Sequence, residues 1–231
     1  MNDLKTADVI CDSGIFISLT SSCLIDILYF FSNKKTVRFV IPPAVEEEMV
    51  DYPMNRRIKR YLFSAIRIKD AINDGVVTKI EKENISHEGE RIMEFANNLF
   101  FLRGKPLKLI QRGESEMLAL AFELGVENLL VDERTTRMLV EAPFRLKEHL
   151  EHEFGVNVMV NKRNLNELSK RIGSLNIIRS SELVAVAYEH GFFRKFGDME
   201  KEAFEAALYR IKFSGCSIGF DEIKDCLKQV K

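Results

Sequence analysis

The sequence has few cysteines, and none of them stands in a paired arrangement. Four cysteines occur in 231 residues, with no Cys-x-x-Cys pair and no histidine at a zinc-finger spacing. A disulfide framework and a structural zinc site both need such pairs, so neither is expected. We expect buried free thiols in a reducing compartment.

The chain also lacks a long hydrophobic run and an excess of one charge. The longest apolar stretch near the start, residues 23–31, carries Asp26 and is too short to cross a bilayer. Residues 2–8 are mixed and polar, unlike a signal peptide. These features predict a cytoplasmic protein without membrane contact. The net charge of −1 excludes a polycationic nucleic-acid binder but allows local basic patches.

Short apolar runs alternate with amphipathic segments in the first two thirds of the chain. A hydrophobic content of 46% is enough for a full core. The pattern predicts an α/β fold with a parallel sheet between helices. The expected strands are 8–12, 37–41, 76–80, 129–131 and 156–160, and the expected helices are 15–31, 44–51, 55–73, 88–102, 114–124 and 135–141.

The last third of the chain shows only helical patterns. Helices are expected at 165–172, 182–190, 199–213 and 221–229, with Ser180 and Ser181 as capping residues of the second. We find no flexible linker and no repeat. The sequence therefore predicts a first domain over residues 1–161 and a helical C-terminal region over residues 162–231.

Two of the apolar runs end on an aspartate, Asp12 and Asp132. The carboxyl ends of parallel strands meet at one edge of a sheet, so both carboxylates are expected there. Carboxylates gathered at one place repel one another unless a cation lies between them. A divalent metal site is one interpretation. The other is that each aspartate is the N-cap of the helix that follows it.

Two glutamates are placed by helical geometry on the apolar side of their helices. In the expected helix 44–51, Glu48 shares a face with Val45, while Glu46 and Glu47 turn away from it. Glu114 lines up with Met117 in the helix 114–124. For Glu48 the alternative is a solvated edge residue, and for Glu114 it is complementarity to the helix dipole. A shift of one residue in the helix start would exchange Glu48 with Glu47.

The order and spacing of several segments resemble a known family, the PIN domain. The resemblance covers residues 8–161. It rests on Asp12-Ser13, on Pro42-x-x-Val45-x-x-Glu48, on Gly113-Glu114-x-Glu116 with Leu118-Ala119-Leu120-Ala121 and Gly125, and on Leu129-Leu130-Val131-Asp132-Glu133-Arg134.

The resemblance implies a three-layer α/β/α fold with a five-stranded parallel sheet, and metal-dependent ribonuclease activity. By position it implies a metal-binding and catalytic set of Asp12, Glu48, Glu114 and Asp132, supported by Ser13, Glu116 and Glu133. An all-oxygen ligand set selects Mg²⁺ or Mn²⁺ over zinc or copper. RNA is the expected partner; a homodimer, an antitoxin and an RNA-processing assembly are further candidates.

Two basic segments flank these acidic residues in the sequence. Residues 53–69 contain no acid and interleave cations with Tyr61 and Phe63, and residues 103–112 also lack an acid. Such segments can hold phosphates while an exposed aromatic stacks on a base. The alternative is a solvated helix face whose aromatics belong to the core. The candidate RNA-binding residues are Arg56, Arg57, Arg60 and Arg112.

These residues are compatible with three different functions. The four-carboxylate set favours a Mg²⁺- or Mn²⁺-dependent ribonuclease, because a protein that only binds RNA has no need for mutually repelling acids. A non-catalytic RNA-binding or assembly module is the second. A phosphohydrolase of the haloacid dehalogenase type is the third, but its chemistry needs a second aspartate where this chain has Gly14.

Overall fold

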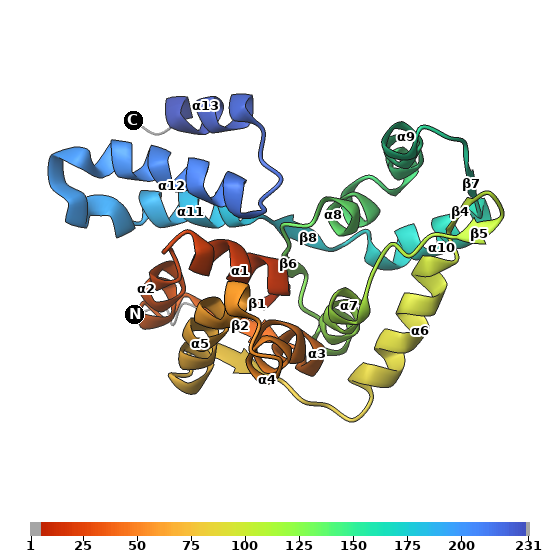
Figure 1. Ribbon diagram of the computed structural model, residues 1–231, viewed down its shortest axis with the longest axis horizontal. Helices are drawn as coiled ribbons and strands as arrows, with labels where there is room; N and C mark the ends of the chain where they lie inside the picture. Colours follow the sequence, from red (N-terminus) through yellow and green to blue (C-terminus); the bar gives the residue numbers. More distant parts are fainter. Residues whose placement is uncertain (1–5, 230–231) are drawn as a thin grey trace.

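The structure is a computed structural model that describes residues 6–229. A central parallel sheet has the strand order β3-β2-β1-β6-β8, and a small antiparallel sheet has the order β5-β4-β7 (Figure 1). The strands are β1 Ala7–Cys11, β2 Val37–Ile41, β3 Val77–Lys79, β4 Phe100–Leu102, β5 Lys105–Pro106, β6 Asn128–Leu130, β7 Val158–Val160 and β8 Asn176–Ile178.

Helices connect these strands and form most of the remaining chain. They are α1 Ser13–Ser21, α2 Asp26–Asn33, α3 Pro43–Glu46, the π-helix η1 Glu47–Asp51, α4 Tyr52–Asn55, α5 Lys59–Asn73, α6 Ile85–Asn97, α7 Arg112–Leu124, α8 Arg134–Glu141, α9 Pro143–Phe154, α10 Lys162–Ile172, α11 Ser180–Glu189, the 3₁₀-helix η2 Phe192–Met199, α12 Glu200–Ser214 and α13 Phe220–Gln229.

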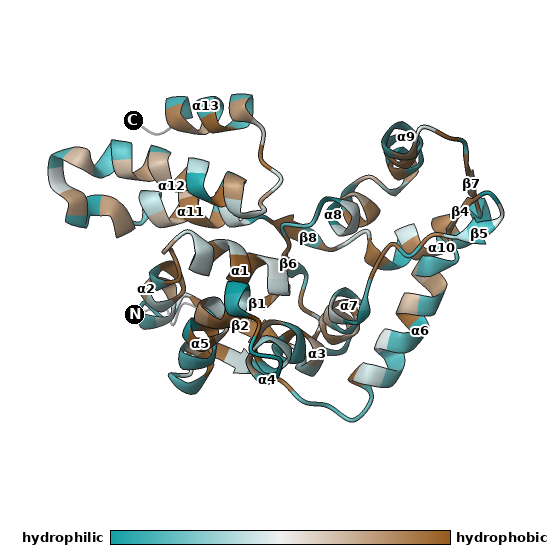
Figure 2. Ribbon diagram, in the orientation of Figure 1, coloured by the Kyte–Doolittle hydropathy of each residue, from teal (hydrophilic) through white to brown (hydrophobic). Residues whose placement is uncertain are grey.

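The alternation of side chains along β1 divides the protein into two hydrophobic cores. Val9 and Cys11 face the core that includes residues of α1, α2, α5, α11 and α12. Ile10, between them, faces the core formed with α6 to α10. Strand residues alternate between the two faces of a sheet, so a sheet covered on both faces needs continuously apolar strands. The brown segments at the centre of Figure 2 follow this pattern.

The α/β class and the five-stranded parallel sheet are confirmed, but the prediction of the fifth strand was wrong. Residues 158–160 pair antiparallel with β4 in the small sheet. The fifth strand is β8, which pairs with β6 and lies where only helices were expected. A three-residue strand is too short to show a period-two pattern.

Three expected helices also differ from the observed ones. The helix expected over 15–31 is two helices, with Cys23 at a positive φ of 58° between them. The helix expected over 55–73 is interrupted at Arg57, where φ is 49°. The helix expected to reach residue 102 ends at Asn97, because the following residues pair as β4. Composition alone does not reveal such turns, since each residue concerned is tolerated inside a helix.

The C-terminal helices pack on the sheet domain. Phe193, Phe204 and Leu208 belong to the same core as Phe16 and Leu19 of α1. Both the central sheet and this core therefore contain residues from each side of the boundary expected between residues 161 and 162. Figure 1 shows α11 and α12 next to α1, and α6, α9 and α10 around the small sheet at the other end.

Within residues 6–229, no single helix is long and apolar enough to cross a membrane. Helices α1 and α2 reach the length only together, and they meet at a bend of 111°.

Candidate active site

Asp12 lies at the carboxyl end of β1, buried between two neighbouring elements. Its backbone N–H donates to the carbonyl of Leu130 at 2.9 Å, which continues the pairing of β1 with β6. Its carboxylate accepts the N–H of Gly14 at 3.2 Å and caps α1. A β-carbon on residue 14 would lie 3.1 Å from the same carboxylate oxygen. Asp12 is thus an N-cap, as the alternative interpretation held, but the cap accounts for only part of its environment.

The electrostatic environment of Asp12 opposes its charge. Burial, followed by the charges of Glu114 and Glu48, raises the pKa of Asp12 to about 8, against hydrogen bonds from Gly14 and Ser13 that lower it. Asp12 is only 4% exposed. A helix cap alone would lower the pKa of an aspartate, because the N–H groups stabilise the anion. The upward shift therefore comes from burial first, and then from the nearby charges of Glu114 and Glu48.

Glu48 approaches this aspartate from the π-helix η1. Burial of its carboxylate raises its pKa, and the nearby Ser13 hydroxyl lowers it. A β-carbon on residue 113 would lie 3.0 Å from Oε2 of Glu48, so glycine leaves room for the carboxylate. Much of the Glu48 side chain remains exposed to solvent. The carboxylate thus lies at a rim between buried protein and water.

The two glutamates before Glu48 have other partners. Glu46 forms an ion pair with Lys79 at 2.8 Å, and Glu47 forms one with Arg112 at 2.9 Å. Only Glu48 of the three affects the pKa of Asp12. The helical-face argument that selected Glu48 over Glu47 is consistent with these contacts.

Glu114 completes the group from the first turn of α7. Its carboxylate accepts the N–H of Gln111 at 3.0 Å in a capping box. Burial first, and then the charges of Glu48 and Glu133, raise the pKa of Glu114, against the backbone hydrogen bonds that lower it. Glu114 therefore has the helix-terminus role expected of the alternative interpretation and also lies close to Glu48 and Asp12.

Glu116 is fully buried and has a structural environment. It accepts the N–H of Ala44 at 3.0 Å, the hydroxyl of Ser86 at 2.9 Å and Nε of Arg112 at 3.0 Å. A β-carbon on Gly89 would lie 2.9 Å from Cγ of Glu116. These contacts join α7 to the start of α3 and to α6. Glu116 thereby holds in place the two segments that carry Glu48 and Glu114.

Asp132 does not join the other three carboxylates. It accepts the backbone N–H of Ser180 at 2.9 Å and the Ser180 hydroxyl at 2.8 and 3.0 Å. The cause is the register of the sheet, in which Cys11 pairs with Leu130, so Asp132 is one position further along than Asp12. Successive side chains of a strand point to opposite faces. Of the four carboxylates predicted as ligands, Asp12, Glu48 and Glu114 are linked through their raised pKa values, while Asp132 is bonded to Ser180.

The adjacent Glu133 lies nearer to the acidic group. Its carboxylate accepts the N–H of Thr135 at 2.9 Å and caps α8. Its charge contributes to the raised pKa of Glu114. A supporting role for Glu133 stays a prediction.

Asp12, Glu48 and Glu114 offer only carboxylate oxygens, which are suitable ligands for a hard cation. Asp12, Glu48 and Glu114 form no ion pair within residues 6–229, although their neighbours Glu46, Glu47 and Glu116 all do. Two carboxylate oxygens occupy positions that a β-carbon on residue 14 or 113 would crowd. Within the same residues, no three His, Cys, Asp or Glu side chains converge as ligands of one ion. Carboxylates that repel one another stay apart unless a cation draws them together.

Basic residues border the acidic group on one side. Arg112, at the start of α7, pairs with both Glu47 and Glu116. Arg56 and Arg57 are exposed in the turn between α4 and α5, and Arg60 is exposed on α5. Tyr61 is 36% exposed and Phe63 is 68% exposed, so the alternative that these aromatics belong to the core was wrong. Figure 2 colours most of α4 and of the loop after β3 as hydrophilic.

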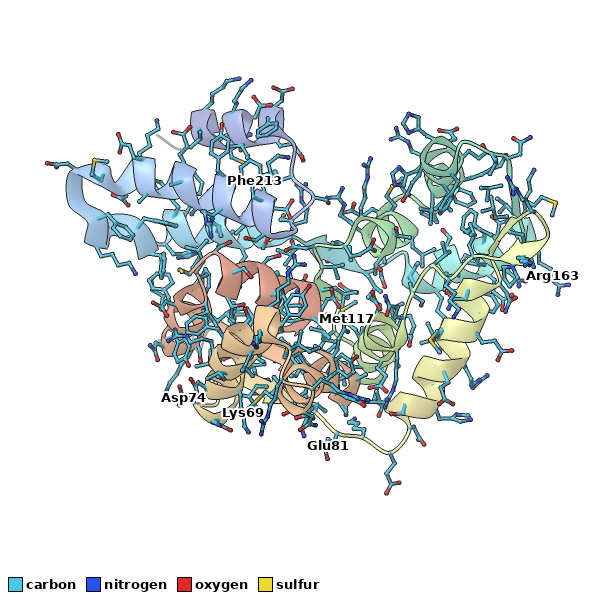
Figure 3. All side chains as sticks on the ribbon, in the orientation of Figure 1. Lys69, Asp74, Glu81, Met117, Arg163 and Phe213 are labelled. Atoms are coloured by element: carbon cyan, nitrogen blue, oxygen red, sulfur yellow. The ribbon has the colours of Figure 1, made fainter. Side chains whose placement is uncertain are left out.

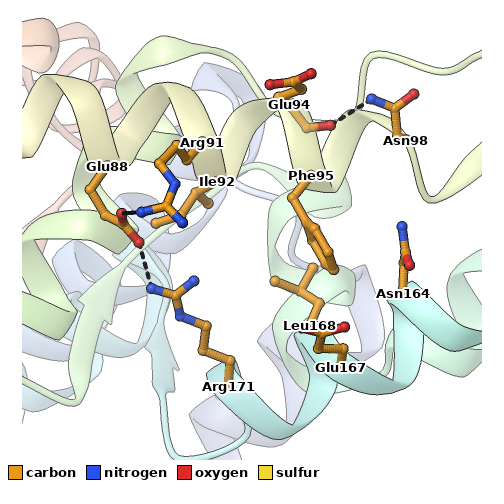
Figure 4. A pocket seen from close by; sticks show the side chains of 10 residues that line it. All are labelled: Glu88, Arg91, Ile92, Glu94, Phe95, Asn98, Asn164, Glu167, Leu168 and Arg171. Atoms are coloured by element: carbon orange, nitrogen blue, oxygen red, sulfur yellow. Dashed lines mark hydrogen bonds and ion pairs between the residues drawn. The ribbon is translucent and has the colours of Figure 1, made fainter.

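A separate cavity of about 420 Å³ lies between α6 and α10, away from the sheet edge (Figure 4). Three carboxylates line it, Glu88, Glu94 and Glu167, of which Glu88 is paired with Arg91 at 3.1 Å and with Arg171 at 2.6 Å. Paired carboxylates have little need of a cation. This cavity is a poorer site for a cation than the acidic group, because Arg91 and Arg171 also line it.

Sequence reasoning missed two residues that matter at the site. Ser180 was expected to cap a helix, but its hydroxyl donates to Asp132, 48 residues away in the sequence. Tyr52 was not considered, yet its side chain is 56% exposed beside Glu48. A serine two residues after β8 would have been a signal only if that strand had been recognised. Comparison with known proteins adds no relative, since no family model, curated protein or solved structure matches this chain.

Proposed function

We propose that this protein is a Mg²⁺- or Mn²⁺-dependent ribonuclease of the PIN type. The observation that carries the proposal is the set of Asp12, Glu48 and Glu114, whose pKa values are all raised, by burial first, with Glu48 and Glu114 adding to the shift of Asp12, and which lack a cationic partner within residues 6–229. Neighbouring glutamates with ordinary structural roles are neutralised by Lys79 or Arg112. The strand order, with Asp12 at the carboxyl end of the central strand β1, supports the same proposal.

The acidic residues would have different roles in this function. Asp12, Glu48 and Glu114 would hold the ion, and Glu116 fixes the segments that carry the two glutamates. When bound, a divalent ion lowers the pKa of water and stabilises charge on a phosphodiester. Glu133, which is exposed near Glu114, could accept a proton.

The basic surface supplies affinity for the RNA backbone. Arg112 lies next to Glu48, Arg56 and Arg57 lie in the exposed turn between α4 and α5, and Arg60 is exposed on α5. Within residues 6–229, none of the last three forms an ion pair, so their charges are available to phosphates. Each phosphate contact on a single strand contributes about 0.7 to the slope of log affinity against log salt.

The direct test is cleavage of single-stranded RNA by the wild-type protein and by Asp12→Asn, with Mg²⁺, Mn²⁺ or EDTA. Asparagine keeps the shape and an acceptor for the Gly14 N–H. We expect metal-dependent cleavage by the wild type, none by Asp12→Asn, and retained cleavage by the control Asp8→Asn at the other end of β1, whose carboxylate pairs with Arg38. Equal activity of wild type and Asp12→Asn would refute the catalytic assignment.

One observation favours a second candidate, a non-catalytic RNA-binding module on the same fold. Asp132 is held by Ser180 and faces away from the other carboxylates. If the protein is such a module, the wild type and Asp12→Asn would bind RNA equally well and neither would cleave it. Replacement of Arg56 and Arg57 by alanine should weaken binding and flatten its salt dependence under either candidate. An unchanged slope would show that this surface does not contact RNA.

A further inference from the structure

Two hollows lie beside the acidic group and share one exposed aromatic residue, Tyr52. The smaller, about 280 Å³, is lined by Glu48, Gly113 and Arg112. The larger, about 430 Å³, is lined by Arg56 and Lys79, among others. Tyr52 and Glu47 line both hollows, so the aromatic ring stands where they meet.

The local fold fixes the position of Tyr52. The π-helix η1 ends at Asp51. The backbone N–H of Tyr52, which caps this helix, donates to the carbonyl of Glu47, five residues earlier. Met49 and Val50 are 2% exposed, and they anchor the helix on its inner side. Pro53, directly after Tyr52, is buried as well. Short π-helical turns occur frequently at functional sites. The tyrosine ring is therefore exposed to solvent on a backbone segment that buried neighbours hold in place, four residues after Glu48.

The charges around Tyr52 favour a nucleobase over a phosphate as the group that binds at its ring. Glu47 and Asp51 are exposed beside the ring and would repel a phosphate at this point. They are also hydrogen-bond acceptors, which suit the amino groups of a nucleobase. Arg112 lies on one side and Arg56 on the other, where the backbone of a strand would continue. An aromatic face between two cations is the arrangement that single-stranded nucleic acids use for stacking.

We propose that Tyr52 is the stacking platform for one nucleobase of a single-stranded RNA, next to the nucleotide whose phosphate reaches Asp12, Glu48 and Glu114. The inference rests on the proposed function and adds a defined subsite to it. The ring supplies a sequence-tolerant contact, and the adjacent arginines hold the backbone on either side.

The test measures binding in EDTA, so that no cleavage occurs. A short single-stranded RNA with one 2-aminopurine reports stacking by loss of fluorescence. We expect Tyr52→Ala to weaken binding about 5- to 150-fold and to abolish the quenching. Tyr52→Phe should bind within about 2-fold of the wild type, because the stacking face is retained. Phe213→Ala is the matched control, since Phe213 is 72% exposed on α12, away from both hollows (Figure 3).

The outcomes separate this inference from the proposed function. If Tyr52→Ala binds like the wild type while Asp12→Asn abolishes cleavage, the stacking site is refuted and the nuclease stands. If Tyr52 governs binding but the wild type never cleaves, the stacking site stands and the nuclease assignment fails. Absence of RNA binding by the wild type would overturn both. Equal melting temperatures of the variants establish that each is folded.

Discussion

The raised pKa of Asp12 predicts how the stability of the metal-free protein depends on pH. In the unfolded chain the carboxyl has its ordinary pKa of 3.8, whereas in the fold the pKa is about 8. Between these values the folded protein binds a proton that the unfolded chain releases. Stability therefore falls as pH rises through this window. The difference corresponds to at most about 6 kcal/mol at high pH, because each pKa unit is worth 1.36 kcal/mol.

Substitution of Asp12 by asparagine isolates this effect. The asparagine side chain cannot ionise and keeps an acceptor for the Gly14 N–H, so the variant should differ little from wild type near pH 4. At pH 9 in EDTA we expect Asp12→Asn to be the more stable protein, by up to about 6 kcal/mol. A chain of this length gains about 2–4 °C of melting temperature per kcal/mol, so the difference is on the order of 10–20 °C.

The assay is thermal unfolding of both proteins from pH 4 to pH 9, with and without Mg²⁺. The difference between the two proteins cancels the other titrating groups, which both share. Mg²⁺ should stabilise the wild type increasingly as pH rises, because the ion replaces a proton, and it should leave the variant unchanged. A stability difference that stays constant across this pH range would show that Asp12 is only a helix cap and would refute the argument.

Three further predictions concern individual side chains. Glu48→Gln should remove Mg²⁺-dependent stabilisation, while Glu47→Gln should change stability by less than about 1 kcal/mol, since Glu47 forms an exposed ion pair; equal effects in thermal unfolding would contradict the placement of Glu48. Glu116→Ala should destabilise the protein by about 3 kcal/mol in urea unfolding, because the buried N–H of Ala44 and the Ser86 hydroxyl lose their acceptor; a loss under about 1 kcal/mol would be inconsistent with the proposed clamp. Ser180→Ala should cost about 2 kcal/mol through Asp132 but leave Mg²⁺ binding intact, and loss of Mg²⁺ binding in calorimetry would place Asp132 in the metal site.

Much of the fold could be predicted from local patterns. The continuous apolar runs that end at Cys11, Ile41 and Leu130 are central strands because both of their faces are covered by helices. The same runs place Asp12 at the edge of the sheet, where helix positions bring Glu48 and Glu114 close to it. These strand predictions are confirmed because each depends on a pattern within one segment, while the roles of Glu48 and Glu114 stay predictions.

The register between strands was decided only by the tertiary structure. Asp12 and Asp132 both follow a buried strand, and by sequence they are equivalent. The pairing of Cys11 with Leu130 offsets them by one residue, so Asp12 turns toward Glu114 while Asp132 turns toward Ser180. Side chains alternate between the faces of a sheet, and the offset between two strands is set by the packing of the whole sheet. The sequence by itself determined which acids reach the sheet edge, and the strand register determined which of them meet.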